Sequence, residues 1–263
     1  MDLPASPGRD LTGILTAARD GALGGLLVGG VDPADLPDPV LAEKALASAG
    51  FVVSLELFPS AVTAHADVVL PVAAAPEKGG SWLDWEGRVR AFDATLHGSG
   101  QLTDARVLTG LADELGVRLG LAGVDAARRE LVTLGGSGRS RRVGGLDVRP
   151  AGGPALQPGQ FVLASWRQLL DEGTLQIDEP ALAGTARPPV ARLCAEAAGR
   201  LGVVDGDRVT VTGPAGSATL PVQVTPMPDR VVWLPMRSPG SSVRAGLGSA
   251  PGAVVTVTAG GPA

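Results

Sequence analysis

The sequence is poor in the residues from which metal sites and catalytic sites are most often built. Its 263 residues include one cysteine, Cys194, two histidines, His65 and His97, and no tyrosine. An iron–sulfur cluster normally needs four thiolates, and structural zinc needs four cysteine or histidine ligands. Two isolated histidines and the lack of a G-x-S-x-G motif also disfavour a Ser-His-Asp triad. The sequence therefore predicts no catalytic residue and no metal ligand.

The chain also lacks an excess of positive charge and a long apolar run. It has 22 Lys and Arg against 27 Asp and Glu, whereas proteins that bind nucleic acid usually present a basic face. The apolar run Leu23–Val31 is far shorter than the roughly 18 residues that a membrane span requires. The N-terminal residues have neither the basic nor the apolar region of a signal peptide. We therefore expect a cytoplasmic protein that binds no nucleic acid and does not insert directly into the membrane.

The first half of the sequence does contain apolar strands that alternate with amphipathic helices. Its clearest helix has Thr103 as N-cap and an apolar stripe of Val107, Leu108, Leu111 and Leu115. Alternation of this kind predicts a parallel, doubly wound α/β sheet. The predicted strands are Leu23–Val31, Phe51–Leu57 and Val68–Val72, and the predicted helices are Leu11–Arg19, Val40–Ser48, Ser60–Ala66 and Thr103–Leu115.

The pattern changes after a stretch rich in Gly, Pro and Arg, which we interpret as a linker over residues 134–159. Short β-branched segments separated by turn signals follow it, and they predict a small barrel. One helix, Ala195–Leu201, interrupts them. The predicted domains are an incomplete α/β domain at 1–133 and a barrel domain at 160–263. The predicted barrel strands are Arg208–Thr212, Ala218–Val224, Val231–Leu234 and Val254–Thr258.

Two strand ends stand out as candidate binding positions. The strand that ends at Pro71 leads into Glu77-Lys78-Gly79-Gly80, then two tryptophans and Glu86-Gly87-Arg88. Open α/β sheets usually place ligands outside such strand ends. Gly29-Gly30 follows the first strand, but the glycine spacing there is not that of a G-x-G-x-x-G dinucleotide fingerprint. This turn is either structural or a place where the backbone approaches a nucleotide or another chain.

Several of these segments resemble one family, the molybdopterin oxidoreductases. The segments GGVDP, FVVSLELFPSAVTAHADVVLPVA and EKGGSWLDWEGRVRAF resemble its third domain, and VARLCAEAAGRLGVVDGDRVTVTGPAG resembles its C-terminal dinucleotide-binding domain, a double-psi β-barrel. The amino-acid sequence around Trp82, Trp85 and Pro235–Gly240 is most similar to the C-terminal part of the G subunits of actinobacterial-type NADH-quinone oxidoreductases, or respiratory complex I. Ser81 and Asp84 depart from the family, which more often has Thr and Asn there.

The resemblance implies a scaffold role. The chain would be the C-terminal portion of a large iron–sulfur subunit, supporting electron transfer from NADH to quinone in a proton-translocating complex without being catalytic or carrying a redox centre. Iron–sulfur clusters and FMN would lie elsewhere in the complex. Other peripheral-arm subunits would be the partners and would hold the chain at the cytoplasmic side of the plasma membrane. Trp82 and Trp85 would be packing anchors, and Arg88 would form a bidentate structural ion pair.

Two alternatives stay open. In the first, the chain is the C-terminal part of a true molybdopterin oxidoreductase of the formate dehydrogenase or nitrate reductase type. Gly29, Gly30, Asp32 and Arg88 would then bind molybdopterin guanine dinucleotide. In the second, it is a free-standing small binding protein. Because its first residues resemble family interior sequence, we expect a piece of a longer subunit.

Overall fold

The computed structural model describes residues 8–121, 123–135, 152–176 and 178–260. The chain divides into two compact units, Met1–Val31 with Ala45–Arg149 and Asp32–Lys44 with Pro150–Ala263. The predicted domain boundaries stay a prediction, and residues 136–151 of the predicted linker lie outside the described residues. Within the described part of the chain, no helix is long and apolar enough to cross a membrane.

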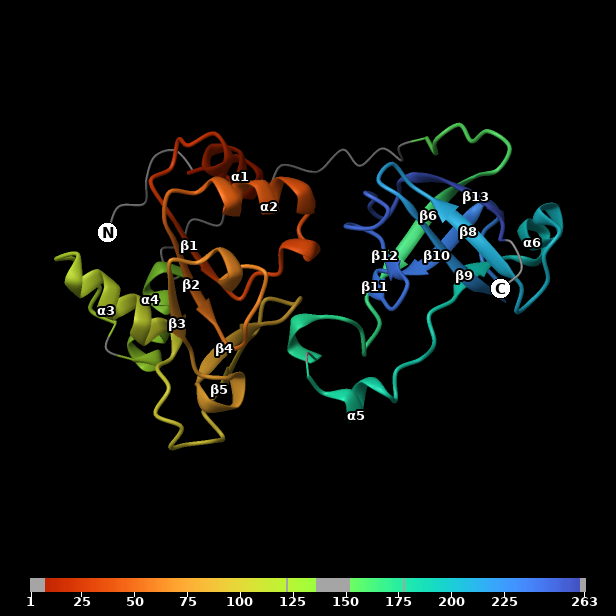
Figure 1. The fold of residues 1–263 in the computed structure, drawn as a ribbon. Helices are drawn as coiled ribbons and strands as arrows, with labels where there is room; N and C mark the ends of the chain where they lie inside the picture. Colours follow the sequence, from red (N-terminus) through yellow and green to blue (C-terminus); the bar gives the residue numbers. More distant parts are fainter. Residues whose placement is uncertain (1–7, 122, 136–151, 177, 261–263) are drawn as a thin grey trace. The chain divides into compact units, whose positions relative to one another are not determined.

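The first unit is built on a parallel sheet of three strands, β1 (Leu26–Gly29), β2 (Val52–Glu56) and β3 (Val68–Pro71), in that spatial order (Figure 1). Leu26 pairs with Val52 and Val53 pairs with Val68. The parallel arrangement requires a crossover between strands, and α2 (Pro39–Ser48) supplies the first one. The prediction of a partial doubly wound α/β unit is confirmed.

Helices cover both faces of this sheet. Successive side chains of a strand point to opposite faces, and β2 carries apolar side chains on both of them. Val52 packs with Leu46 of α2 in one apolar cluster, whereas Leu55 packs with Val107 of α3 (Asp104–Glu114) in another. The other helices of the unit are α1 (Leu11–Arg19) and α4 (Val124–Gly135), with the short 3₁₀ turns η2 (Thr63–His65) and η3 (Ala75–Glu77).

The sequence predicted most, but not all, of these elements. Helix α1 matches its predicted range, and the Thr103 side chain caps α3 by accepting a hydrogen bond from the Arg106 N–H. The predicted stripe of α3 is only half right, because Leu115 is 80% exposed and Leu108 is also exposed. The predicted helix Ser60–Ala66 is only the turn η2. Helix α4 and a hairpin of β4 (Gly80–Leu83) and β5 (Val89–Phe92) were not predicted.

The second unit contains a closed barrel of six strands in the order β10-β6-β13-β8-β9-β7 (Figure 1). Two of its strand pairs, β6–β10 and β7–β9, are parallel, and the other pairs are antiparallel. A small double-psi-type barrel is thus confirmed. The strands are β6 (Gln160–Trp166), β7 (Ala191–Leu193), β8 (Arg208–Thr212), β9 (Ser217–Val224), β10 (Val231–Pro235) and β13 (Val254–Ala259), and a small ribbon consists of β11 (Arg237–Ser238) and β12 (Ser241–Ser242).

The barrel interior is mainly aliphatic. Alternate residues of β8 and β9 are buried, and they form one cluster with Leu163, Leu193 and Leu234. Strands β6 and β7 were not predicted. Strand β7 is three residues long and too short for a periodic pattern. Helix α6 (Ala195–Leu201) matches its prediction, but α5 (Pro180–Ala183) shows that it is not the only helix after residue 160. The second unit also has the turns η1 (Pro33–Asp35) and η4 (Thr174–Gln176).

Candidate functional site

The segment after Pro71, one of the two candidate binding positions, contains the β4–β5 hairpin. Gly80 lies opposite Phe92 and Leu83 lies opposite Val89 in an antiparallel ribbon. The Asp84 carboxylate closes the turn, because its Oδ1 accepts hydrogen bonds from the Glu86 N–H at 3.0 Å and the Arg88 N–H at 2.8 Å. The departure from Asn at position 84 therefore keeps the acceptor that the turn needs.

Gly80 is required by the packing at the base of this hairpin. A Cβ atom at this position would lie 2.6 Å from the Phe92 ring, closer than any real contact of this kind. The same ring stacks against Trp82, with 5.9 Å between ring centroids and an angle of 22° between the planes. The glycine thus leaves room for Phe92 to sit under the tryptophan.

Arg128 of α4 holds the hairpin base and was missed by the sequence analysis. Its Nη2 donates to the Gly80 carbonyl at 2.6 Å and to the Phe92 carbonyl at 2.8 Å, and its Nε donates to the Ser81 hydroxyl at 3.2 Å. Asp125, one turn earlier on the helix, accepts from Nη1 at 3.0 Å. A planar guanidinium can reach several acceptors at once, which makes this residue a clamp between α4 and the hairpin.

The outer part of the hairpin presents an exposed apolar surface. Four large apolar side chains there are each more than two-thirds exposed, and Trp85 at the turn is 94% exposed. Two-stranded hairpins are at best marginally stable in water. Exposed apolar patches edged by charged residues mark interaction sites. We define this surface, Trp82, Leu83, Trp85 and Val89, as the hairpin patch.

The charged residues around the hairpin make local contacts. Nη1 of Arg88 lies 2.6 Å from Oε2 of Glu86 in a largely exposed ion pair, so this pair holds no separate elements together. Arg88 was expected to form a bidentate ion pair, and its pair with Glu86 has one contact, whereas the residue that joins the hairpin to α4 is Arg128. Glu77 accepts a hydrogen bond from the Ala74 N–H at 2.9 Å, which lowers the pKa of its carboxyl group. Glu77 and Glu86 therefore act as a cap and an ion-pair partner.

The other residues of the dinucleotide hypothesis lie at the end of β1. Gly29 is the last residue of β1, and Gly30 has a left-handed backbone with φ +61°. Asp32 belongs to the second unit, where its carboxylate accepts from the Ala34 N–H at 3.0 Å and pairs with Arg237. Their binding to a cofactor stays a prediction.

Cys194 has a structural environment. Its thiol is buried at the start of α6, where it accepts from the Ala197 N–H at 3.4 Å. Burial raises the pKa of the thiol. In the ranges that the structure covers, no group of three or more His, Cys, Asp or Glu side chains could hold a metal ion.

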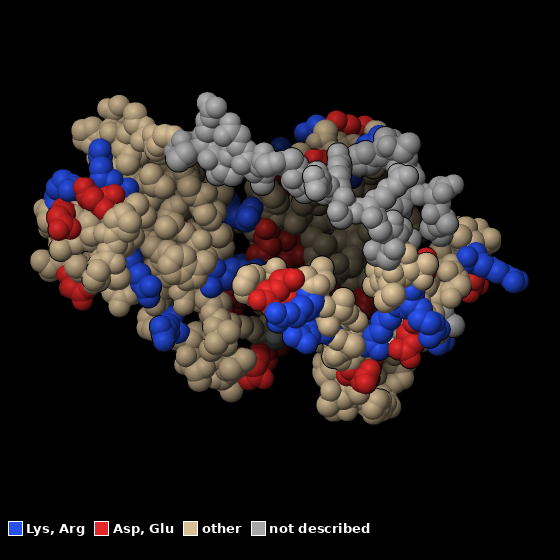
Figure 2. All heavy atoms as spheres, turned by 180° about the vertical axis from the view of Figure 1, so that it is seen from behind, with Lys and Arg blue, Asp and Glu red and all other residues tan. Residues whose placement is uncertain are grey.

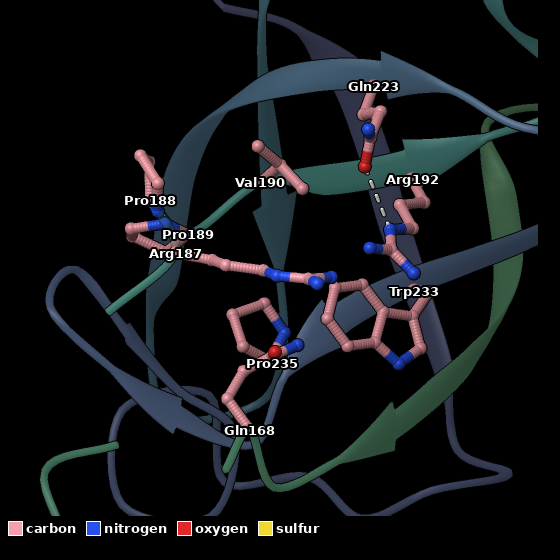
Figure 3. A pocket seen from close by; sticks show the side chains of 9 residues that line it. All are labelled: Gln168, Arg187, Pro188, Pro189, Val190, Arg192, Gln223, Trp233 and Pro235. Carbon is pink, nitrogen blue, oxygen red and sulfur yellow. Dashed lines mark hydrogen bonds between the residues drawn. The ribbon is translucent and has the colours of Figure 1, made fainter. Parts of the chain in front are cut away.

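The barrel unit carries a pocket that the sequence analysis did not identify (Figure 3). Its volume is about 270 Å³. The floor includes Trp233, which is 2% exposed and packs against Trp166 with ring centroids 4.9 Å apart. The lining residues are Gln168, Arg187, Pro188, Pro189, Val190, Arg192, Gln223, Trp233 and Pro235.

Two guanidinium groups face this pocket. Arg192 lies over the Trp233 ring, 4.5 Å from its centroid, and its Nε donates to Oε1 of Gln223 at 3.0 Å. Figure 3 shows Arg187 reaching across the pocket toward the tryptophan. The lining contains no carboxylate, and no ion pair of Arg187 or Arg192 occurs within the described ranges. The pocket is therefore positively charged.

The pocket is small for a dinucleotide. Cavities that enclose drug-sized ligands usually measure about 300–1,000 Å³, and this one is about 270 Å³. Its chemistry suits an anion, since arginine binds carboxylates and phosphates through paired N–H groups. Its volume and chemistry thus fit a small anionic group.

Comparisons with known proteins agree for both units. Two family models match, Molybdopterin oxidoreductase over residues 1–105 and Molydopterin dinucleotide binding domain over residues 161–262. The chain is 51% identical to the NADH-quinone oxidoreductase G subunit of Mycobacterium tuberculosis over 98% of this chain and 32% of that protein. It is also 51% identical to the G subunit of the Streptomyces coelicolor enzyme, over 100% of this chain and 31% of that protein. The chain thus spans about a third of the length of these relatives.

A solved structure has a similar fold. Acetylene hydratase from Pelobacter acetylenicus matches with a TM-score of 0.56 and 18% identity, over 85% of this chain and 39% of that protein. At this level of identity, the match concerns the fold alone.

Proposed function

Because the chain belongs to the molybdopterin oxidoreductase family and has G subunits of NADH-quinone oxidoreductases as relatives, we propose that it is a scaffold portion of such a complex. In this proposal it is the C-terminal part of the large iron–sulfur subunit. It supports electron transfer from NADH to quinone and carries no redox centre itself. FMN and iron–sulfur clusters lie in other parts of the complex, which holds the chain at the cytoplasmic side of the membrane.

The observation that carries the scaffold role is the hairpin patch. Trp85 is 94% exposed at the turn of the hairpin, so its side chain buries almost no surface within this chain. Aromatic side chains are enriched where protein interfaces concentrate their binding energy. Arg128 holds the base of the hairpin to α4, which links the patch to the rest of the unit.

The charge distribution supports the same role. Figure 2 shows that the middle of one face of the barrel unit is free of charged side chains, which lie around its edge. Depletion of charge is the compositional sign of an interface core.

The chemistry of Cys194 also agrees with the proposal, because a buried thiol with a raised pKa is a poor metal ligand.

The alternative function is the dinucleotide-binding part of a true molybdopterin oxidoreductase. The match of residues 161–262 to a dinucleotide-binding domain model favours it. The engagement of Asp32 by Arg237 and the small volume of the barrel pocket weigh against it. We therefore keep the scaffold as the principal proposal.

The test is affinity purification of the tagged chain from its own cells. We expect the eluate to contain FMN, iron and acid-labile sulfide, to oxidise NADH and to contain no molybdenum. Stoichiometric molybdenum and pterin would refute the scaffold role and support the alternative. An eluate without flavin and iron would refute membership of the complex.

A matched pair of variants tests the hairpin patch itself. Trp85→Ala removes the exposed aromatic side chain, and Leu115→Ala removes a comparably exposed apolar side chain from the end of α3. A central interface residue contributes about 2 kcal/mol or more, which corresponds to roughly thirtyfold weaker binding. We expect this loss for Trp85→Ala alone. Equal recovery of flavin with both variants would contradict the role of the patch.

A further inference from the structure

The pocket of the barrel unit has a charge opposite to that of the whole chain. The formal net charge of the chain is −5, yet Arg187 and Arg192 line the pocket without any carboxylate beside them. Placing two guanidinium groups together without a counter-ion is unfavourable. An anionic occupant would relieve this repulsion.

The pocket walls restrict how an occupant is held. Pro188, Pro189 and Pro235 contribute apolar surface and no backbone N–H donor. Hydrogen bonds to an occupant would therefore come mainly from side chains. Arg192 uses its Nε on Gln223 and lies over Trp233, which fixes the orientation of its two terminal nitrogens. A fixed guanidinium that presents two terminal N–H groups matches the two oxygens of a carboxylate.

The surroundings of the pocket suit a polypeptide. Gln168 in the lining is followed by Leu169, which is 92% exposed, and Trp166, which packs on Trp233, is also exposed. These apolar side chains offer contacts beyond the pocket that a small free anion would not use. The small pocket volume also matches a single side chain better than a cofactor.

We propose that the Arg187–Arg192 pocket binds the carboxylate of an aspartate or glutamate side chain on a neighbouring polypeptide, with apolar residues of the same segment over Trp166 and Leu169. This proposal rests on the scaffold function above, because one part of a larger complex has such neighbours. The pocket would then be a second attachment point of the chain, independent of the hairpin patch.

The test uses the full 263-residue chain and two synthetic peptides. The acidic peptide is acetyl-Leu-Asp-Glu-Leu-amide, and its neutral counterpart has Asn and Gln in place of Asp and Glu. Binding is followed by calorimetry and by the indole N–H signals of the chain labelled with ¹⁵N-tryptophan. We expect the acidic peptide to bind with a Kd of about 1 mM or below and to shift the Trp233 signal. The neutral peptide should bind at least about tenfold more weakly.

Three variants locate the site. Arg187→Gln changes an exposed side chain and should leave the fold intact while weakening binding at least about tenfold. Arg192→Lys keeps the charge but loses the paired N–H geometry, and it should also weaken binding. Arg244→Gln, elsewhere in the barrel unit, should bind like the unchanged chain. Equal binding by Arg187→Gln and Arg244→Gln would overturn the proposal.

Further ligands separate the sources of the anion. Succinate that binds as tightly as the acidic peptide would show that the pocket takes a free dicarboxylate, and it would overturn the polypeptide assignment. GDP or pyrophosphate that displaces the peptide would show a phosphate site and have the same effect. Absence of binding by the acidic peptide would refute the proposal. If the affinity purification succeeded nevertheless, only the pocket proposal would fail and the scaffold function would stand.

Discussion

Removing the guanidinium of Arg128 should detach the hairpin from α4 without disturbing the barrel. Arg128→Ala leaves the Gly80 and Phe92 carbonyls without their charged donor. A hydrogen bond to a charged group contributes about 1.5–3 kcal/mol. Because the Arg128 side chain is 23% exposed, water compensates part of this hydrogen-bond energy in the variant. We therefore expect the local stability of the hairpin to fall by about 3 kcal/mol for the two bonds together.

The assay is hydrogen exchange followed by mass spectrometry, which reports the two units separately. A loss of about 3 kcal/mol corresponds to roughly a hundredfold faster exchange in peptides from β4 and β5, if they exchange through local opening. Peptides from β8 and β9 of the barrel should be unchanged. Arg128→Lys keeps the charge but cannot reach all the acceptors, so it should recover less than half of the loss.

The matched control is Arg129→Ala, the next residue of α4, which is exposed. Its effect on stability should stay within about 0.5 kcal/mol. The clamp interpretation is refuted if Arg128→Ala and Arg129→Ala give the same exchange in the hairpin peptides. It is also refuted if the barrel peptides lose protection to the same extent.

Two further predictions concern packing and protonation. Gly80→Ala should destabilise the first unit by about 1–3 kcal/mol, since the added Cβ meets the Phe92 ring. Gly110→Ala in the middle of α3, where the Cβ has open space, should instead stabilise the unit by about 0.5–1 kcal/mol. Urea denaturation measures both changes in unfolding free energy, and changes of the same sign would contradict the packing argument. The folded pKa of Cys194 is raised by burial, so the folded state binds the thiol proton more tightly, and the unfolding free energy should fall as pH rises above the ordinary thiol pKa of about 8.5. Cys194→Ala should remove this part of the alkaline dependence, and a pH profile that Cys194→Ala leaves unchanged would refute it.

Much of the fold could be predicted because its signals are local. Helix α1 and α6 and strand β8 match their predicted ranges, since their caps and alternating apolar residues lie within each segment. Strand β7 was missed because three residues are too few for a pattern. The α3 stripe was half wrong, because only the tertiary arrangement decides which apolar residues of a helix face the sheet.

The candidate sites were predictable to a smaller extent. The sequence drew attention to the segment Glu77–Arg88 and its tryptophans, but the structural arginine it singled out was Arg88, for which it predicted an ion pair, and it did not identify Arg128. Arg128 lies more than thirty residues away in sequence, so no local spacing connects it with the hairpin. Arg187 and Arg192 lie five residues apart, just before and within β7, but Trp233 comes from β10, and only the closed barrel brings the two segments to one pocket.

The amino-acid sequence by itself determined the family, the two kinds of unit and the lack of ligands for a conventional iron–sulfur or zinc site, because each depends on which residues are present and on short-range patterns. The tertiary structure alone decided that Trp85 is exposed, that Gly80 makes room for Phe92 and that two arginines share a pocket without a carboxylate. Exposure and proximity between distant segments are properties of the packed chain. They follow from how strands pair and helices dock, which no single segment encodes.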